Sequence, residues 1–124
     1  MKFRTEVSIY KQKSIIYQQM KAKYSIYQLN TSDEGKKLLH LTFADIHEKV
    51  NPALYDKVWD GEIEYEKNPI KAIEAEIGTD LPAGFYGHML SISDIIVINS
   101  EEAFYVDGTG YKKLGDDVLS KLVA

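Results

Sequence analysis

Residues 95–107, IIVINSEEAFYVD, decide how this chain is expected to fold. The segment IIVIN (95–99) opens with four consecutive apolar residues, which is typical of a strand buried on both faces at the centre of a sheet. The polar residues SEE (100–102) predict a turn, and AFYVD (103–107) predicts the returning strand of a hairpin. The sequence therefore places a buried hairpin in its last third.

Further strands are predicted on the N-terminal side of this hairpin. YSIYQL (24–29) is rich in β-branched and aromatic residues, and LYDKVWDGEIEYE (54–66) is an extended segment. LLHLTF (38–43) also suits a strand. Residues 3–9 alternate Phe, Thr, Val and Ile with charged or polar residues, which indicates a strand of period two.

The clearest helix signal lies just before the hairpin. Asn68 is a suitable N-cap, Pro69 fits the first helical position, and Gly78 is expected to close the helix. Three isoleucines share one face of this helix: Ile70, Ile73 and Ile77.

Three other helices are predicted from composition and spacing. Residues 10–22 gather apolar and aromatic side chains on one face. ADIHEKV (44–50) suits a short helix that ends before Pro52, because the residue before a proline avoids the α region. DDVLSKLV (116–123) predicts a closing helix whose apolar side carries Val118, Leu119 and Leu122.

The remaining segments are expected to be turns and loops. NTSDEGKK (30–37) is a turn by composition, and LPAGFYGHMLSISD (81–94) is a loop rich in Gly and Pro. GTG (108–110) breaks the second strand of the hairpin. These elements predict one α+β domain: a mainly antiparallel sheet or open barrel with two or three packed helices.

Charge is distributed unevenly along the 124 residues. Residues 1–23 have a net charge of +5, whereas the remaining residues hold nine Lys against eighteen Asp and Glu. We therefore expect a basic arm over 1–23, packed on an acidic domain over 24–124. The acidic domain argues against direct nucleic-acid binding, which depends on Lys and Arg contacts to phosphates.

The composition also suggests a location and excludes some chemistry. There is no Cys, which excludes disulfides and thiolate metal sites and suggests a reducing compartment. No apolar run approaches the length of a membrane span, so we expect a cytoplasmic protein that does not act at a membrane.

Two motifs resemble those of the YodL-like domains of Firmicutes. GHMLSISDIIVIN (87–99) is similar to the family's Gly-His-Ser-Leu-Ser-Val-Ser-Asp-Val-Ile-Val pattern, with Met89 where the family usually has Ser. AFYVDGTGY (103–111) matches its Tyr-Val-Asp and Gly-aromatic positions. YSIYQL and LTFADI extend the likeness over Tyr24 to Tyr111. The resemblance implies an accessory role in mobile-element biology, where small proteins often counteract a host defence.

The first of these motifs contains the residue types of a hydrolase. His88, Ser91, Ser93 and Asp94 could supply a nucleophile, a base and an acid, but neighbours in sequence seldom converge on one point. The structural alternative is favoured: Gly87 permits an unusual backbone angle, His88 caps or bridges the loop, and Ser93 or Asp94 bonds backbone N–H groups.

Other possible sites carry weaker signals. His40 and His47 with Asp45 or Glu48 have no known metal-site spacing. A Mg²⁺ nuclease could be drawn from Asp56 or Asp60, Glu64 or Glu66, and Lys67. FYVDGTGY lacks the Lys of a phosphate-binding loop, so a turn is favoured there. We expect no metal and no cofactor.

The segment WDGEIEYEK (59–67) carries an acid at every second position. On a strand these acids share one face, with Trp59, Ile63 and Tyr65 behind them, and they lie about 6.5–7 Å apart, close to the phosphate spacing of a nucleic-acid strand. Such a row either protects an edge strand from aggregation or imitates a nucleic-acid backbone. The row consists of Asp60, Glu62, Glu64 and Glu66.

The sequence therefore predicts a non-enzymatic binding protein from a mobile element that inhibits a host defence complex such as the CRISPR effector Cas9. The acidic row would contact a basic nucleic-acid-binding groove. An aromatic anchor would add affinity, and the candidates are Tyr55, Tyr65 and Phe85. The alternatives are a metal-dependent nuclease, a hydrolase centred on His88 and Asp94, and a protein-assembly module that uses its sheet edge or dimerises through a helix over 9–24.

Overall fold

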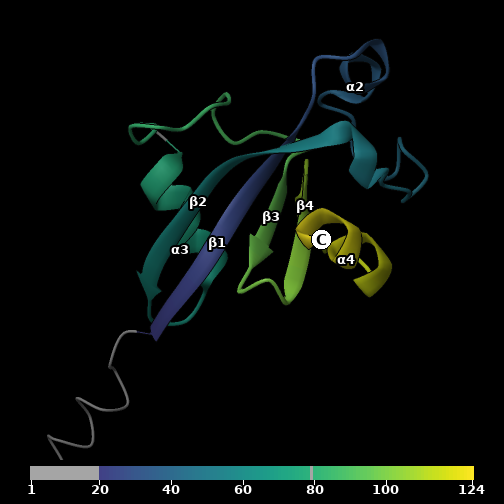
Figure 1. Cartoon of the computed structure of the whole chain (residues 1–124). Helices are drawn as coiled ribbons and strands as arrows, with labels where there is room; N and C mark the ends of the chain where they lie inside the picture. Colours follow the sequence, from purple (N-terminus) through teal and green to yellow (C-terminus); the bar gives the residue numbers. More distant parts are fainter. Residues whose placement is uncertain (1–19, 79) are drawn as a thin grey trace, which may run out of the picture.

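The fold is an open five-stranded sheet with helices on both faces, described here from a computed structural model over residues 20–78 and 80–124 (Figure 1). Its elements, in chain order, are β1 (Met20–Leu29), α2 (Asp33–Leu38), the 3-10 helix η2 (Pro52–Leu54), β2 (Tyr55–Tyr65), α3 (Pro69–Ile77), β3 (Ile95–Ile98), β4 (Glu102–Asp107), β5 (Gly110–Lys113) and α4 (Asp116–Val123).

The strand order is β2-β1-β3-β4-β5, and every neighbouring pair is antiparallel. The apolar run of β3 explains its central place, because all four of its residues are buried. The strand β2 lies at one edge of the sheet, and its pairing with β1 contains an irregularity between Ile26 and Tyr27. Trp59 and Lys57 are the partners of these two residues, which leaves Val58 as the extra residue of a β-bulge.

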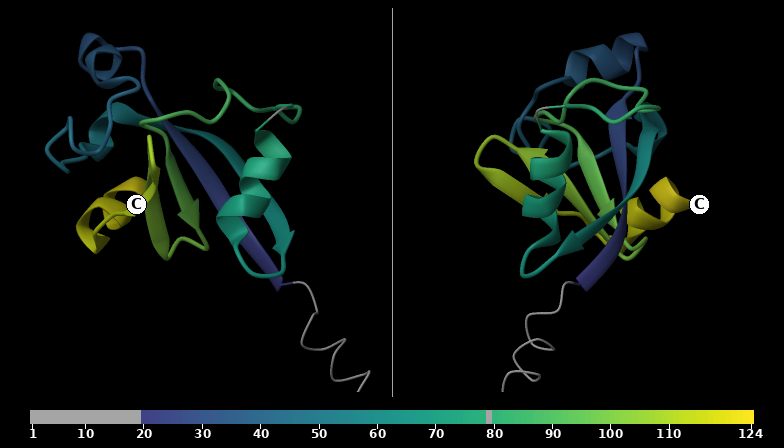
Figure 2. Two further views of the ribbon diagram at one scale, coloured as in Figure 1. Left: turned by 180° about the vertical axis from the view of Figure 1, so that it is seen from behind. Right: turned by 90° about the vertical axis from the view of Figure 1, so that its left-hand side faces the viewer.

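The two faces of the sheet are covered by different elements (Figure 2). On one face, Ile73 and Ile77 of α3 pack against Tyr24, Ile26 and Ile96. On the other face, α4 and the segment 43–55 pack against a second cluster around Tyr27, Val97 and Tyr105. The sheet is thus the middle layer of three.

The strand β1 differs along its length. From Ile26 onward every residue is buried, because both faces are covered. From Met20 to Tyr24 only alternate residues are buried, so one face of the sheet is open to solvent at this end. The exposed residues of this half include Lys21 and Lys23.

Several predictions are confirmed. The strands at 24–29, 54–66 and 95–107 are present, and the sheet is antiparallel with three helices. The helix α3 begins at Pro69 with Asn68 as its N-cap: the Asn68 side chain accepts hydrogen bonds from Ile70 N and Lys71 N. Gly78 follows as the C-cap, and α4 packs through Val118, Leu119 and Leu122 as predicted.

The segment between β1 and β2 was predicted wrongly. NTSDEGKK is not only a turn: Ser32 accepts a hydrogen bond from Gly35 N and so starts the short helix α2. LLHLTF is not a strand and ADIHEKV is not a helix. Residues 39–50 form successive turns, in which His40, His47 and Glu48 adopt positive φ values. Phe43, Ile46 and Val50 nevertheless pack on the core, which explains the apolar pattern.

Two further differences concern the ends of the sheet. The helix predicted over 10–22 is wrong at its C-terminal end, because residues 20–22 belong to β1. The dimerisation helix predicted over 9–24 is wrong in the same way, because residues 20–24 also belong to β1. The rest of that helix, the strand over 3–9 and the packing of the basic arm lie outside the described residues. Gly110 does not end the hairpin but begins β5, a strand missing from the prediction.

No helix in the described ranges is both long enough and apolar enough to cross a membrane.

Candidate protein-binding site

The acidic row lies on the strand β2, as predicted, and this strand forms one edge of the sheet. Side chains of β2 alternate between exposed and half-buried from Trp59 to Tyr65, with Asp60, Glu62 and Glu64 exposed. Ile63 and Tyr65 pack on the α3 side of the sheet. Glu66 is also exposed but follows the last residue of the strand. Three of the four acids therefore form a regular row, and Glu66 extends it into the next turn.

Hydrogen bonds of two aromatic side chains hold β2, the strand that carries this row. Trp59 Nε1 donates to the Tyr24 hydroxyl over 3.0 Å, and that hydroxyl donates to Glu76 of α3. The ring of Tyr24 lies over Gly61, where an added Cβ would meet both Tyr24 and Trp59. These contacts hold β2 on α3, so the acids opposite them project from a rigid backbone.

Lysines of β1 lie beside the acids on the same face. Lys21 is the register partner of Glu64, and Lys23 is the register partner of Glu62. Directly opposite residues of an antiparallel pair have side chains about 5 Å apart at their Cβ atoms. The acidic row is thus bordered by a basic row on its inner side, while its outer side has no strand in the described part of the chain.

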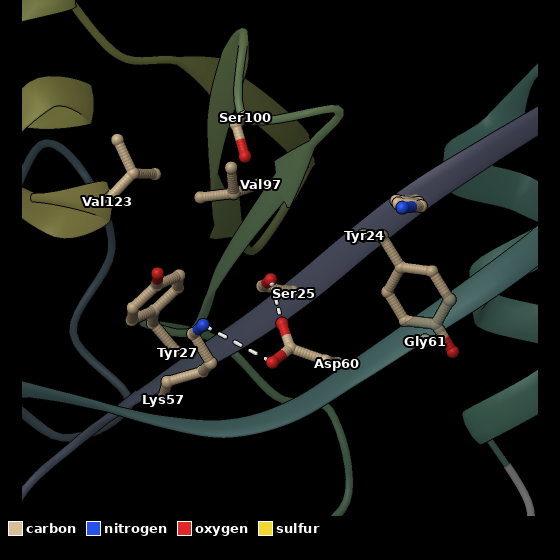
Figure 3. A pocket seen from close by; sticks show the side chains of 10 residues that line it. Tyr24, Ser25, Tyr27, Lys57, Asp60, Gly61, Val97, Ser100 and Val123 are labelled. Atoms are coloured by element: carbon tan, nitrogen blue, oxygen red, sulfur yellow. Dashed lines mark hydrogen bonds and ion pairs between the residues drawn. The ribbon is translucent and has the colours of Figure 1, made fainter.

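Asp60 is the most constrained of the acids (Figure 3). It accepts hydrogen bonds from the Ser25 hydroxyl and from Lys57 Nζ, the latter at 3.3 Å. The Ser25 hydrogen bond, with a smaller contribution from Lys57, lowers the pKa of Asp60 below its ordinary value. Its carboxylate is therefore partly neutralised by its own chain, whereas Glu62 and Glu64 have only the lysines beside them.

A hollow of about 230 Å³ separates this part of the sheet from the end of α4 (Figure 3). Lys23, Ser25 and Asp60 line its polar side, and Val97 and Val123 line its apolar side. It is partly open to solvent, and three of its polar side chains, Ser25, Lys57 and Asp60, already bond one another. We therefore treat it as part of the exposed face of β1 and β2.

The predicted aromatic anchors belong to the interior more than to the surface. The Tyr55 hydroxyl donates to Ser93 O over 2.6 Å, and its ring packs in the α4-side cluster. Tyr65 and Phe85 are half-buried on the α3 side, with Phe85 stacked on Trp59 at a centroid distance of 5.8 Å. All three take part in core packing.

Among the described residues, the most exposed aromatic residue is Tyr86, which is not one of the predicted anchors. Tyr86 follows Phe85 and is 87% exposed. With Trp59 and Gly84 it borders a second hollow of about 230 Å³ next to the bulge of β2. The only sequence signal for this exposure was the position of Tyr86 next to Phe85, which is half-buried, because adjacent residues of an extended segment face opposite ways.

The motif GHMLSISD joins the sheet through a hydrogen-bonded cluster in which Gln28, Ser93 and Asp94 are buried. Gln28 of β1 lies at its centre: its Nε2 donates to His88 O over 2.7 Å and to Asp94 Oδ2 over 3.1 Å, and its Oε1 accepts from His88 N over 3.1 Å. Asp94 Oδ2 also accepts from Ser91 N. The loop is therefore fastened to the sheet through one side-chain amide.

The predicted structural roles are confirmed in this cluster, with one change. Asp94 bonds the backbone N–H of Ser91, and Ser93 Oγ accepts from His40 N over 3.2 Å. Nδ1 of His88 lies 2.8 Å from Met89 O, so it must carry a proton and donate, because a carbonyl only accepts. Gly87, however, has no positive φ. It is needed because a Cβ there would overlap the Gln28 side chain.

Asp94 is fully buried, and burial raises its pKa to about 7 against the opposing effects of Ser91 N–H, His88 and Gln28. Its Oδ1 and the Ser91 hydroxyl have no hydrogen-bond partner in the described residues. These groups do not form a nucleophile–base pair, because the only ring contacts of His88 within hydrogen-bond distance there are Met89 O and Gln28.

The other possible sites do not come together. Among residues 20–78 and 80–124, no three His, Asp or Glu side chains are placed to hold a metal ion, and His40 and His47 lie in separate turns. In FYVDGTGY a turn at residues 108–109 follows the strand β4, as predicted. Asp107 Oδ1 accepts from Gly108 N and from Phe43 N, so it ties the β4–β5 hairpin to the segment before β2.

Comparison with known proteins identifies the family. Neither a curated protein nor a solved structure matches the chain at a significant level. A family model for the YodL-like domain matches residues 23–116, which include all five strands except the first three residues of β1. The chain therefore belongs to the YodL-like domain family.

Proposed function

We propose that this protein is a non-enzymatic, cytoplasmic accessory protein of a mobile genetic element that inhibits a host defence complex by direct binding. The target would be a complex with a basic nucleic-acid-binding groove, and a CRISPR effector such as Cas9 is the sharpest example. The observation that supports this proposal is the exposed row of acids on the edge strand β2.

The charge of the domain supports the same choice of partner. Residues 20–124 hold eleven Lys against eighteen acidic residues, a net charge of −7. A domain with this charge attracts a basic groove over a distance set by ionic strength, about 8 Å at physiological salt. Acids spaced about 6.5–7 Å apart along β2 can then occupy successive phosphate positions.

The lysines of β1 limit how the partner can approach. Lys21 and Lys23 border Glu64 and Glu62 on the inner side, so a basic groove pressed flat on this face would meet both signs of charge. Approach from the outer side of β2 meets the carboxylates first. We therefore place the contact along the edge of the sheet, with charge guiding association and choice of partner more than affinity.

The test measures cleavage of target DNA by purified Cas9 loaded with guide RNA, with the protein added in increasing amounts. The wild-type protein is expected to reduce cleavage, and Glu62→Lys/Glu64→Lys is expected to need at least tenfold more protein for the same effect. The matched control is Glu34→Lys/Glu101→Lys, which changes the net charge equally at exposed acids away from β2.

Three results would contradict the proposal. The wild-type protein could leave cleavage unchanged, or the two double variants could inhibit equally. The protein could also degrade DNA or RNA by itself in the presence of Mg²⁺ or Mn²⁺, which would identify an enzyme.

A further inference from the structure

The outer edge of β2 has a defined hydrogen-bonding pattern. Asn99 N donates to Lys23 O over 2.7 Å, so the backbone groups of Lys23 point towards β3. Because successive residues of a strand direct their backbone groups to opposite sides, Ala22 and Tyr24 point towards β2. Their register partners are Ile63 and Gly61. It follows that the N–H and C=O groups of Asp60, Glu62 and Glu64 point away from the sheet.

These three residues therefore offer two features to an incoming strand. Each exposes its backbone groups along the open edge, and each carries a carboxylate on one face of the same edge. In the described residues, only one backbone hydrogen bond is made to this edge: Tyr86 N donates to Val58 O over 3.1 Å. This bond closes the edge at the bulge. The open segment thus runs from Asp60 to the end of β2.

The charges of the row decide what kind of strand can add there. A second copy of the chain would place its own acids opposite Asp60, Glu62 and Glu64, and like charges directly opposite are unfavourable. A strand with Lys or Arg at every second position would instead give each acid a basic neighbour on its outer side, matching Lys21 and Lys23 on its inner side.

The bulge end of the edge offers a place for an apolar side chain. The hollow between Trp59, Gly84 and Tyr86 lies directly beyond Asp60, and Tyr86 is almost fully exposed at its border. An extended segment that pairs with Asp60–Glu64 would bring its next side chain to this hollow. Backbone pairing supplies affinity in such complexes, and side-chain pockets supply specificity.

We propose that the partner binds by strand addition: an extended segment with Lys or Arg at alternate positions, followed by an apolar residue, pairs with the outer edge of β2 from Asp60 to Glu64. This inference rests on the proposed function for the existence of a basic partner. It adds how the partner is held, and it applies to any protein that carries such a segment.

The first test uses synthetic peptides of about seven residues, a usual strand length. One peptide alternates Lys with Val or Thr and ends in Leu. A second has the same composition with its lysines grouped. A third repeats the first with methyl groups on the amide nitrogens that would face β2. We expect the first to bind at least tenfold more tightly than the other two, and to protect the amides of Glu62 and Glu64 from hydrogen exchange.

The second test changes the edge itself. In Glu62→Pro the missing N–H is one that faces outward, so the pairing with β1 is kept. Glu62→Thr removes the same charge but keeps the N–H. We expect the Pro variant to bind the alternating peptide at least tenfold more weakly than the Thr variant. If the Pro variant does not fold, the methylated peptide decides the question.

Some outcomes would overturn strand addition and leave the proposed function intact. Equal binding of the Pro and Thr variants, or of the plain and methylated peptides, would mean that only charge is recognised. Sedimentation that shows a wild-type dimer lost in Glu62→Pro would assign the edge to a second copy. Conversely, tight peptide binding without any effect on Cas9 would overturn the proposed target and leave strand addition standing.

Discussion

The cluster around Gln28 and the acidic row on β2 place their carboxyl groups in opposite environments, one buried and one exposed. Asp94 is fully buried, receives hydrogen bonds from a backbone N–H and a side-chain amide, and has a raised pKa. Asp60 is exposed, bonds a hydroxyl and a lysine, and has a lowered pKa. Burial dominates at the first carboxyl and hydrogen bonding at the second.

This difference indicates which region serves stability and which can serve recognition. Removing a partner from a buried polar group leaves that group without water or protein to replace it, which is costly. Changing an exposed charge costs little, because solvent takes its place. Substitutions in the buried cluster should therefore change folding, and substitutions in the row should change binding with little effect on folding. The following predictions test this contrast in order of decreasing effect.

The largest effect is expected for Gln28→Ala. Gln28 is 3% exposed, and its loss would leave His88 N and His88 O without their partner and would remove one of the two donors to Asp94 Oδ2. We expect a loss of about 3–5 kcal/mol in the free energy of unfolding, measured by urea titration. The control is Lys23→Ala, an exposed position on the same strand, which should cost less than about 1 kcal/mol. A loss below about 1 kcal/mol for Gln28→Ala would show that other contacts hold the loop.

The second effect depends on pH and concerns Asp94. The pKa of this carboxyl is raised to about 7 in the folded state, above its ordinary 3.8, so the folded protein binds the proton more tightly than the unfolded chain. Stability from this group is present at low pH and is lost as pH rises towards 7. Asp94→Asn carries no charge, so its stability relative to the wild type should rise by roughly 2–3 kcal/mol between pH 5 and pH 8.

Parallel urea titrations of both proteins across this range would measure that change. Because the two proteins differ at one group, the titration of groups that do not interact with Asp94 cancels; the interaction with His88, which lowers the pKa of Asp94, remains part of the measured difference. A constant difference between them would mean that the buried carboxyl keeps an ordinary pKa.

A smaller effect is expected for the stability of Glu62→Lys/Glu64→Lys. The new lysines would lie opposite Lys23 and Lys21, and like charges in directly opposite positions repel. We expect a loss of about 0.5–1.5 kcal/mol that shrinks when salt is raised from 0.05 to about 0.5 M. Glu34→Lys/Glu101→Lys should not show the same salt dependence. A loss independent of salt would point to a backbone change in β2.

The smallest effect is expected for Asp60→Asn. The carboxyl is exposed, so the loss should stay within about 0.5 kcal/mol at pH 7 despite its two hydrogen bonds. Because the pKa of Asp60 is lowered in the folded state, the carboxylate stabilises the fold above its ordinary pKa. This stabilisation disappears as pH falls through the folded-state pKa. Thermal unfolding at pH 7 and below pH 3 would detect the difference; an equal loss at both would contradict the electrostatic origin.

The elements that could be predicted from the sequence are those with a strong local signal. The apolar run at 95–98 and the Asn-Pro start of α3 determine their structure almost independently of the rest of the chain. The alternation from Trp59 to Tyr65 likewise fixed which side chains of β2 face outward. These features depend on periodicity and capping, which act within a few residues.

The parts that could not be predicted depend on distant contacts. Residues 39–50 follow neither helix nor strand, because Phe43 N bonds Asp107 and His40 N bonds Ser93. The central role of Gln28 had no local signal, since its partners lie 60 or more residues further along the chain. The pairing of Lys21 and Lys23 with residues of the acidic row depends on which strands are neighbours, and composition does not reveal this order.

The position of β1 has a consequence for how the chain folds during synthesis. In the chain, β1 is separated from its first neighbour, β2, by a long connection. Its second neighbour is β3, and the residue after β3, Asn99, bonds Lys23 of β1 across a separation of 76 residues. A sheet built from such remote pairs folds slowly, because the loop must close before the contacts form. On the ribosome, the apolar side of β1 must therefore wait for the β3–β4 hairpin to emerge. In this interval we expect the nascent chain to be vulnerable to aggregation and to depend on chaperones.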